Sequence, residues 1–258
     1  MLTSDVKRKI ISMAGLILMV FLWRYDLFIG MKKQTDAPIA TVFLSHLFGG
    51  SYAREKIDYT VSVLSLIAIM YITLLFSQHF IKDMAENCVY IFTRYKSRKR
   101  WNIKKLYSLL AWGAVGIGIV LIMYAINAVV ESTAAISLED GKMFLCVYCM
   151  LVFFFYVSVL AINYIALYKG SIVGIVSYYS VVFLSSIITL LSQNSEKKQI
   201  WIHILNPMSN IYIGWNFTDL HVLLGIIYFV VICIIFIGCI WIKIRKMDLG
   251  INIEKENV

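Results

Sequence analysis

Charged residues are scarce in this chain: Lys, Arg, Asp and Glu together make up 15% of its 258 residues. Soluble globular domains carry about 25% charged residues. Hydrophobic residues account for 60% of the chain, and its only two prolines, Pro38 and Pro207, lie outside the long apolar stretches. This composition excludes an ordinary soluble protein. The apolar stretches and their connections also leave no room for a soluble domain of even about 50 residues.

Sequence motifs for chemistry are missing as well. There is no G-x-x-x-x-G-K-[ST] phosphate loop, so the chain cannot bind ATP in that manner, and neither H-E-x-x-H nor G-x-S-x-G occurs. Cys146 and Cys149 have the C-x-x-C spacing, but their neighbours are apolar. We interpret them as buried hydrophobic residues, because a zinc or redox site needs polar partners. We expect no catalytic, cofactor-binding or metal-binding residues.

Six long apolar stretches dominate the chain, and five of them run for 21 to 25 residues without Lys, Arg, Asp or Glu. A helix of about 20 residues crosses the hydrocarbon core of a bilayer. In lipid the backbone must satisfy its own hydrogen bonds, which makes each stretch a helix. We predict an all-α membrane protein, a single transmembrane domain over 1–258, with six spans at about 10–29, 59–80, 106–129, 143–167, 171–191 and 220–242.

The first span has the weakest signal. Its core, Ile10–Leu22, is short and follows the basic residues 7–9, as in a signal peptide. No small-x-small cleavage site follows, and continuing to Ile29 gives a helix long enough to cross the membrane. Arg24 then reaches the outer interface by extending its side chain. We interpret the segment as an uncleaved span.

The distribution of basic residues sets the orientation. With the N-terminus inside, 16 of the 24 Lys and Arg residues fall in inner segments and 8 in outer ones. Positive residues favour the cytosolic side, so both termini are predicted to be cytosolic, in a multi-pass protein of the cell membrane. The net charge of +9 then reflects topology, and we expect no binding to nucleic acid.

Inside the spans the polar groups are hydroxyls, amides and tyrosines. Charged groups within a membrane usually mark proton relays or ion paths, and spans two to six contain none apart from His79 and His221, at the edges of the second and sixth. Two interpretations of the uncharged groups remain open. They hydrogen-bond between helices, or they line a path for an amphipathic substrate.

Two outer segments are unusually apolar. Residues 37–48 are typical of an amphipathic helix lying at the membrane interface. Residues 200–215 either dip into the outer leaflet, fold over the mouth of the bundle, or serve only as an aromatic anchor. Gly170 and Gly174, which open the fifth span, favour close helix packing within the bundle.

The inner loop after the second span has a clear pattern. Residues 83–95 have helical periodicity, with apolar and polar faces, and predict a short amphipathic helix at the membrane surface. Residues 96–105 place six basic side chains around Trp101. We expect this tryptophan to sit at the interface, where the basic residues attract anionic lipid headgroups.

The six spans, this inner helix, the segment IFTRYKSRKRW at 91–101 and the segment ILNPMSNIYIGW at 204–215 together resemble the small type-2 ABC-transporter permeases. These bacterial subunits are often encoded with bacteriocin or antibiotic resistance and immunity exporters. The turn at 168–170 is shorter than in that family, which leaves little for further ATPase contact.

The resemblance implies two functional segments. A coupling helix that docks on an ATPase subunit is expected at Met84–Tyr95, with contacts from Met84, Glu86, Asn87, Tyr90, Ile91, Arg94 and Tyr95. An outer gate is expected at Ile200–Trp215, with key residues Trp201, Asn206, Pro207, Tyr212 and Trp215.

The function expected from this resemblance is a non-catalytic permease of an exporter for an amphipathic peptide, antibiotic or lipid-like substrate. Its partners are cytosolic ATPase subunits, which hold the ATP and Mg²⁺, a second identical or homologous permease, and membrane lipids. The alternative is a stand-alone immunity or sensor protein that binds a peptide or partner at its outer loops. An intramembrane enzyme is the third hypothesis.

Overall fold

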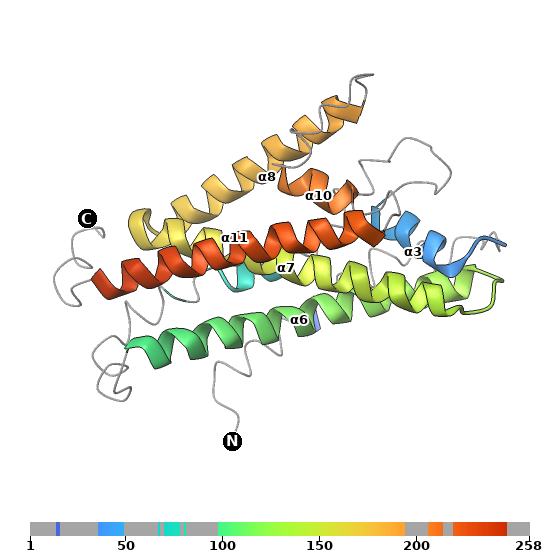
Figure 1. Ribbon diagram of the computed structural model, residues 1–258, viewed down its shortest axis with the longest axis horizontal. Helices are drawn as coiled ribbons and strands as arrows, with labels where there is room; N and C mark the ends of the chain where they lie inside the picture. Colours follow the sequence, from blue (N-terminus) through green and yellow to red (C-terminus); the bar gives the residue numbers. More distant parts are fainter. Residues whose placement is uncertain are drawn as a thin grey trace. The chain divides into compact units, whose positions relative to one another are not determined.

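The computed structural model describes residues 14–15, 36–48, 67, 70–77, 80, 98–193, 206–213 and 219–246. These ranges contain no β-strand. The helices are α3 (Ile39–Phe48), α6 (Arg98–Glu131), α7 (Leu138–Lys169), α8 (Ser171–Gln193), α10 (Pro207–Ile213) and α11 (Asp219–Lys246), as Figure 1 shows.

Four helices are long and apolar enough to cross a membrane: Lys99–Glu131, Leu138–Lys169, Ser171–Thr189 and Leu223–Arg245. They coincide with the predicted third to sixth spans. The chain is therefore a helical membrane protein, and the all-α prediction is confirmed for the part that the structure describes. The predicted spans at 10–29 and 59–80 lie mostly outside the described residues.

Helix α6 starts earlier than predicted. Its 34 residues extend over about 51 Å, well beyond a hydrocarbon core of about 30 Å. The basic segment from Arg98 to Lys105, which we treated as part of a loop, is its first two turns. The reason is local: this segment has no Gly or Pro, and its five Arg and Lys residues favour helix.

The chain divides into two compact units, one of Met1–Leu75 with Gly113–Cys149 and the other of Phe76–Trp112 with Met150–Val258. Helices α6 and α7 each contribute residues to both. In the first unit α3 is a helix, as predicted for residues 37–48, but its apolar residues are buried in protein. Ile39, Phe43 and Leu47 are at most 1% exposed. The ring of Phe43 packs edge-on against Phe144 of α7, with centroids 4.4 Å apart.

In the second unit α7 supplies most of the core. In the apolar stretch that could cross the membrane, 72% of α7 is buried inside the protein, compared with 17% of the same kind of stretch in α8 and 22% in α11. Phe154 of α7 packs edge-on against Phe229 of α11, and Phe155 packs against Phe76. A helix that is apolar on every side is buried by its neighbours, and α7 fits that rule.

The turn between α7 and α8 is tight. Gly170 has φ +85°, a conformation that favours glycine, and its N–H donates to Ala166 O at 3.0 Å. One turn later a Cβ on Gly174 would lie 2.7 Å from Ile162 O and 3.0 Å from the Cβ of Ala166. The prediction of close packing within the bundle is therefore confirmed for Gly174. At Gly170 nothing lies within 4 Å of a Cβ position, and the backbone conformation, not packing, favours glycine there.

Candidate functional site

The predicted outer gate contains a short helix, α10, which begins directly after Asn206. The side-chain Oδ1 of Asn206 accepts a hydrogen bond from the N–H of Met208 at 2.9 Å, as a helix N-cap does. Pro207 occupies the first helical position, where its missing N–H costs nothing. The Asn-Pro pair in the sequence therefore starts α10 where it does.

Asn206 also joins α10 to α8. Its Nδ2 donates to Ser185 O at 2.8 Å and to the Thr189 hydroxyl at 3.1 Å. All three residues are buried. A buried amide that satisfies both its oxygen and its nitrogen fixes the relative position of the two segments it joins. We call Asn206, Ser185 and Thr189 the α8–α10 latch.

Helix α10 lies between α8 and α11 and packs against both (Figure 1). Met208 and Ile211 are fully buried, and the carbonyl of Asn210 lies 3.5 Å from a Cβ position on Gly225 of α11. Residues 206–213 thus fold against the spanning helices and do not form a free loop. Tyr212 lies in α10, although its side chain is outside what the structure describes, as are Trp201 and Trp215.

The predicted coupling helix lies wholly outside the described residues, which resume at 98 after residue 80. This applies to Met84, Glu86, Asn87, Tyr90, Ile91, Arg94 and Tyr95. The residues on either side of the segment are described, and they show how its two ends are held.

At the start of the segment, the amide of Asn163 holds the backbone of Phe76 and Phe80. Its Oδ1 accepts from the N–H of Phe80 at 3.2 Å, and its Nδ2 donates to Phe76 O at 3.1 Å and to Val159 O at 2.8 Å. Asn163 is fully buried in α7. It supplies the partners that backbone groups lose where a helix ends.

At the end of the segment, Trp101 packs edge-on against Phe80, with ring centroids 6.0 Å apart. Trp101 is 2% exposed. The expectation that it anchors among lipid headgroups is therefore wrong, because protein covers its ring. The contact brings residues 80 and 101 together, on either side of the segment that the structure does not describe.

Hydroxyl groups of the described spans find partners within the protein. Ser158 hydrogen-bonds to Tyr178 across α7 and α8, and the Tyr156 hydroxyl donates to Leu106 O of α6. Ser180 and Ser186 donate to carbonyls of their own helix. For these residues the interpretation of hydrogen bonding in and between helices holds.

A second polar cluster lies in the first unit, where α3 meets the start of α7. Ser137 and Asp140 form a reciprocal cap: Ser137 Oγ accepts from the N–H of Asp140, and the Asp140 carboxylate accepts from the N–H and hydroxyl of Ser137. The other carboxylate oxygen accepts from the N–H of Ala40 at 2.9 Å, in the first turn of α3. Asp140 therefore caps two helices.

Asp140 precedes the uncharged stretch that begins at Met143. Burial raises the pKa of its carboxyl group, but the hydrogen bonds from Ser137 and Ala40 outweigh burial and hold that pKa below its ordinary value of 3.8. Asp140 is thus a carboxylate at neutral pH. The pattern Ser-x-x-Asp before an apolar run was the sequence signal for this cap, and our sequence reading missed it.

The far end of α3 is held by a second contact. His46 Nε2 lies 2.6 Å from Glu131 Oε2, the last residue of α6. Just before the start of α3, the Ser132 hydroxyl donates to Ala37 O, and the Thr133 hydroxyl donates to the Asp36 carboxylate. Residues about 85 to 100 apart in sequence are joined here. No local pattern reveals such pairs.

No group of three or more His, Cys, Asp or Glu side chains suited to a metal ion occurs in the ranges that the structure describes. Cys146 and Cys149 are free thiols and are half-buried. Both side chains are therefore less buried than our interpretation of them as buried hydrophobic residues predicted.

The fold and the two polar clusters define a helical membrane protein whose helices are fixed to one another by buried amide and carboxylate groups. A family model described as a protein of unknown function, DUF2705, matches residues 14–250. The chain belongs to this family. No curated protein and no solved structure matches the chain.

Proposed function

We propose that this protein is the non-catalytic, membrane-spanning permease subunit of an ATP-binding-cassette exporter. The proposal includes six spans in one domain with both termini cytosolic, in the cell membrane. Two copies, or one copy and a homologous permease, pair with two cytosolic ATPase subunits that hold ATP and Mg²⁺.

The α8–α10 latch is the observation that carries the proposal. The segment before the last spanning helix folds back between α8 and α11 and is held there by Asn206. An outer gate of the kind that the resemblance implies needs a short element at this point of the chain, held by contacts that can break and re-form. Hydrogen bonds of an amide to a carbonyl and a hydroxyl meet that need.

The proposed mechanism couples ATP to the gate through the inner segment between residues 80 and 101. ATP binding closes the ATPase subunits and draws the coupling helices at Met84–Tyr95 together. Because Phe80, Asn163 and Trp101 hold both ends of the segment, a displacement of the helix is transmitted to α6 and α7. The bundle then opens outward and α10 moves away from α8.

The cargo is proposed to be an amphipathic peptide, antibiotic or lipid-like molecule. The fourth and fifth spans, Met143–Leu167 and Ser171–Leu191, carry hydroxyls and amides but no Asp, Glu, Lys or Arg. Such spans offer nothing to stabilise a charged substrate in the hydrocarbon region. An uncharged or amphipathic molecule fits them better.

A stand-alone immunity or sensor protein is the second candidate, and the Asp140 cluster favours it. Asp140 fixes the first turn of α3, and the contact of His46 with Glu131 fixes its far end. A fixed outer element is what a surface that recognises a peptide or partner requires. The two candidates differ in whether the protein needs an ATPase subunit.

A pair of double variants tests the coupling-helix assignment. Tyr90→Ala with Arg94→Glu removes a Tyr and an Arg, the residue types most often found as interface hot spots, whose truncation costs about 2 kcal/mol or more. We expect it to release the ATPase in detergent pull-downs of correctly inserted protein, or to uncouple hydrolysis from transport. Lys99→Gln with Arg100→Gln is the control and should do much less. The reverse result would place the docking site on the basic turn of α6.

A further inference from the structure

The second unit has a basic end, where α7 and α11 both finish. Lys169 ends α7, and Lys243 and Arg245 lie in the last turns of α11. The ammonium group of Lys243 lies 3.8 Å from the ring centroid of Tyr168, a cation–π contact that fixes a flexible side chain in place. Tyr168 and Lys169 are exposed.

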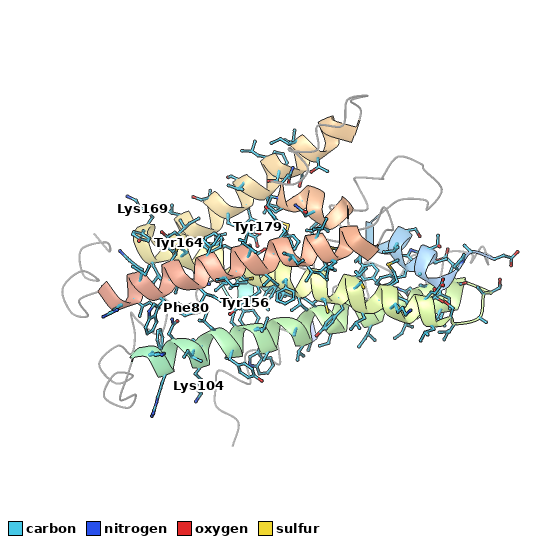
Figure 2. All side chains as sticks on the ribbon, viewed as in Figure 1. Phe80, Lys104, Tyr156, Tyr164, Lys169 and Tyr179 are labelled. Carbon is cyan, nitrogen blue, oxygen red and sulfur yellow. The ribbon has the colours of Figure 1, made fainter. Side chains whose placement is uncertain are left out.

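Aromatic rings line this end just inside the lysines. Tyr164 packs edge-on against Tyr168, with centroids 5.3 Å apart, and against Phe236 of α11 at 5.9 Å. Figure 2 places Tyr164 and Lys169 at the same end as Lys104 of α6. Tyrosine rings with an apolar body and a polar tip are typical of the boundary between hydrocarbon and headgroups.

Acidic residues are absent from this end among the residues that the structure describes. In the described part of the second unit the single Asp or Glu is Asp219, the first residue of α11. It lies 24 positions before Lys243, about 36 Å along the helix. The positive charge of Lys169 and Lys243 is therefore not neutralised by a described carboxylate of this unit.

Exposed aliphatic side chains lie close to the two lysines in sequence, one in α11 and one in α8. Ile242 adjoins Lys243 and is 53% exposed, and Ile172 lies in the first turn of α8 and is 75% exposed. Cations beside an aromatic pair, with apolar surface adjoining, match a molecule that has an anionic head and an apolar tail.

We propose that Lys243, Lys169 and Tyr168 form a site for the phosphate group of an anionic phospholipid, whose acyl chains lie along the exposed faces of α8 and α11. The lipid, and not a free phosphate ion, is favoured because the cations are continuous with that apolar surface. This inference does not depend on the exporter proposal.

The test measures lipid binding to the purified full-length protein in neutral detergent by native mass spectrometry and by thermal melting. The probes are phosphatidylglycerol, phosphatidylcholine and inorganic phosphate. We expect phosphatidylglycerol to bind and to raise the melting temperature more than phosphatidylcholine does. Lys243→Gln should weaken phosphatidylglycerol binding roughly fivefold, the effect of one basic residue near an anionic headgroup.

Two further variants keep the test independent of folding. Lys243→Arg retains the charge and the contact with Tyr168 and should bind like the wild type. Lys142→Gln removes an exposed lysine from the opposite end of α7 and should have no effect. Equal weakening by Lys243→Gln and Lys142→Gln would overturn the proposal. So would stabilisation by inorganic phosphate alone, or a loss of ATPase binding in Lys243→Gln with lipid binding unchanged, which would mark a protein interface.

Discussion

At the scale of residues, three buried polar side chains hold helices together. Asn163 satisfies the backbone of Phe76 and Phe80, Asn206 caps α10 and joins it to α8, and Asp140 caps both α7 and α3. Each donates to or accepts from backbone groups that would otherwise lie buried without partners. Losing such a partner costs about 1–3 kcal/mol, more than the hydrogen bond itself contributes.

Asp140→Ala should therefore destabilise the protein by about 2 kcal/mol, the sum of a lost cap and an unpaired N–H on Ala40. Glu139→Ala is the control, since Glu139 is the exposed neighbour in the same turn. Thermal melting of the detergent-solubilised protein measures both. Equal melting temperatures for the two variants would show that the double cap contributes nothing.

The same residue predicts a pH dependence. The pKa of Asp140 lies below its ordinary value of 3.8 in the folded protein, so its contribution to stability is complete above that value. It is lost only as the pH falls through the lower, folded-state pKa. The difference in melting temperature between wild type and Asp140→Ala should thus be constant from about pH 5 to 8, and a difference that vanished within this range would contradict the assignment.

At the scale of elements, the contact between α7 and α8 depends on Gly174. An alanine Cβ there would lie 2.7 Å from Ile162 O, a backbone atom that cannot move alone. Gly174→Ala should cost about 1–3 kcal/mol and separate the two helices. Gly238→Ala in α11 is the matched control, because nothing lies within 4 Å of its Cβ position. It should be neutral or slightly stabilising, since Ala favours helix over Gly. The same loss of stability in both variants would mean that the close contact at Gly174 is not its cause.

The elements also show what the sequence can and cannot predict. Long uncharged runs predict α6, α7, α8 and α11, because the thickness of a bilayer leaves few alternatives. The Asn206-Pro207 pair marks the start of α10. Trp101 was predicted at the membrane interface because its neighbours are basic, but it is buried and packs against Phe80. Such a contact, like that of His46 with Glu131, depends on the tertiary fold, so periodicity does not reveal it.

At the scale of the whole molecule, the distribution of Lys and Arg predicts the topology. Because basic residues are held on the cytosolic side, a reporter fused after Val258 should report the cytosol, and one inserted near Glu139 should report the exterior. The fusions are read with paired reporters that are active on opposite sides of the membrane. An exterior signal at the C-terminus would overturn the predicted orientation and, with it, a cytosolic coupling helix.

The central claim is that this chain moves its cargo with energy from a separate subunit. The most direct measurement is ATP hydrolysis by the purified chain, compared with the complex that it forms in its native membrane. Because the chain has no phosphate loop, it should show no hydrolysis above background. The complex should contain a subunit with that loop and should hydrolyse ATP. Robust hydrolysis by the isolated chain, or a native complex without any such subunit, would contradict the account.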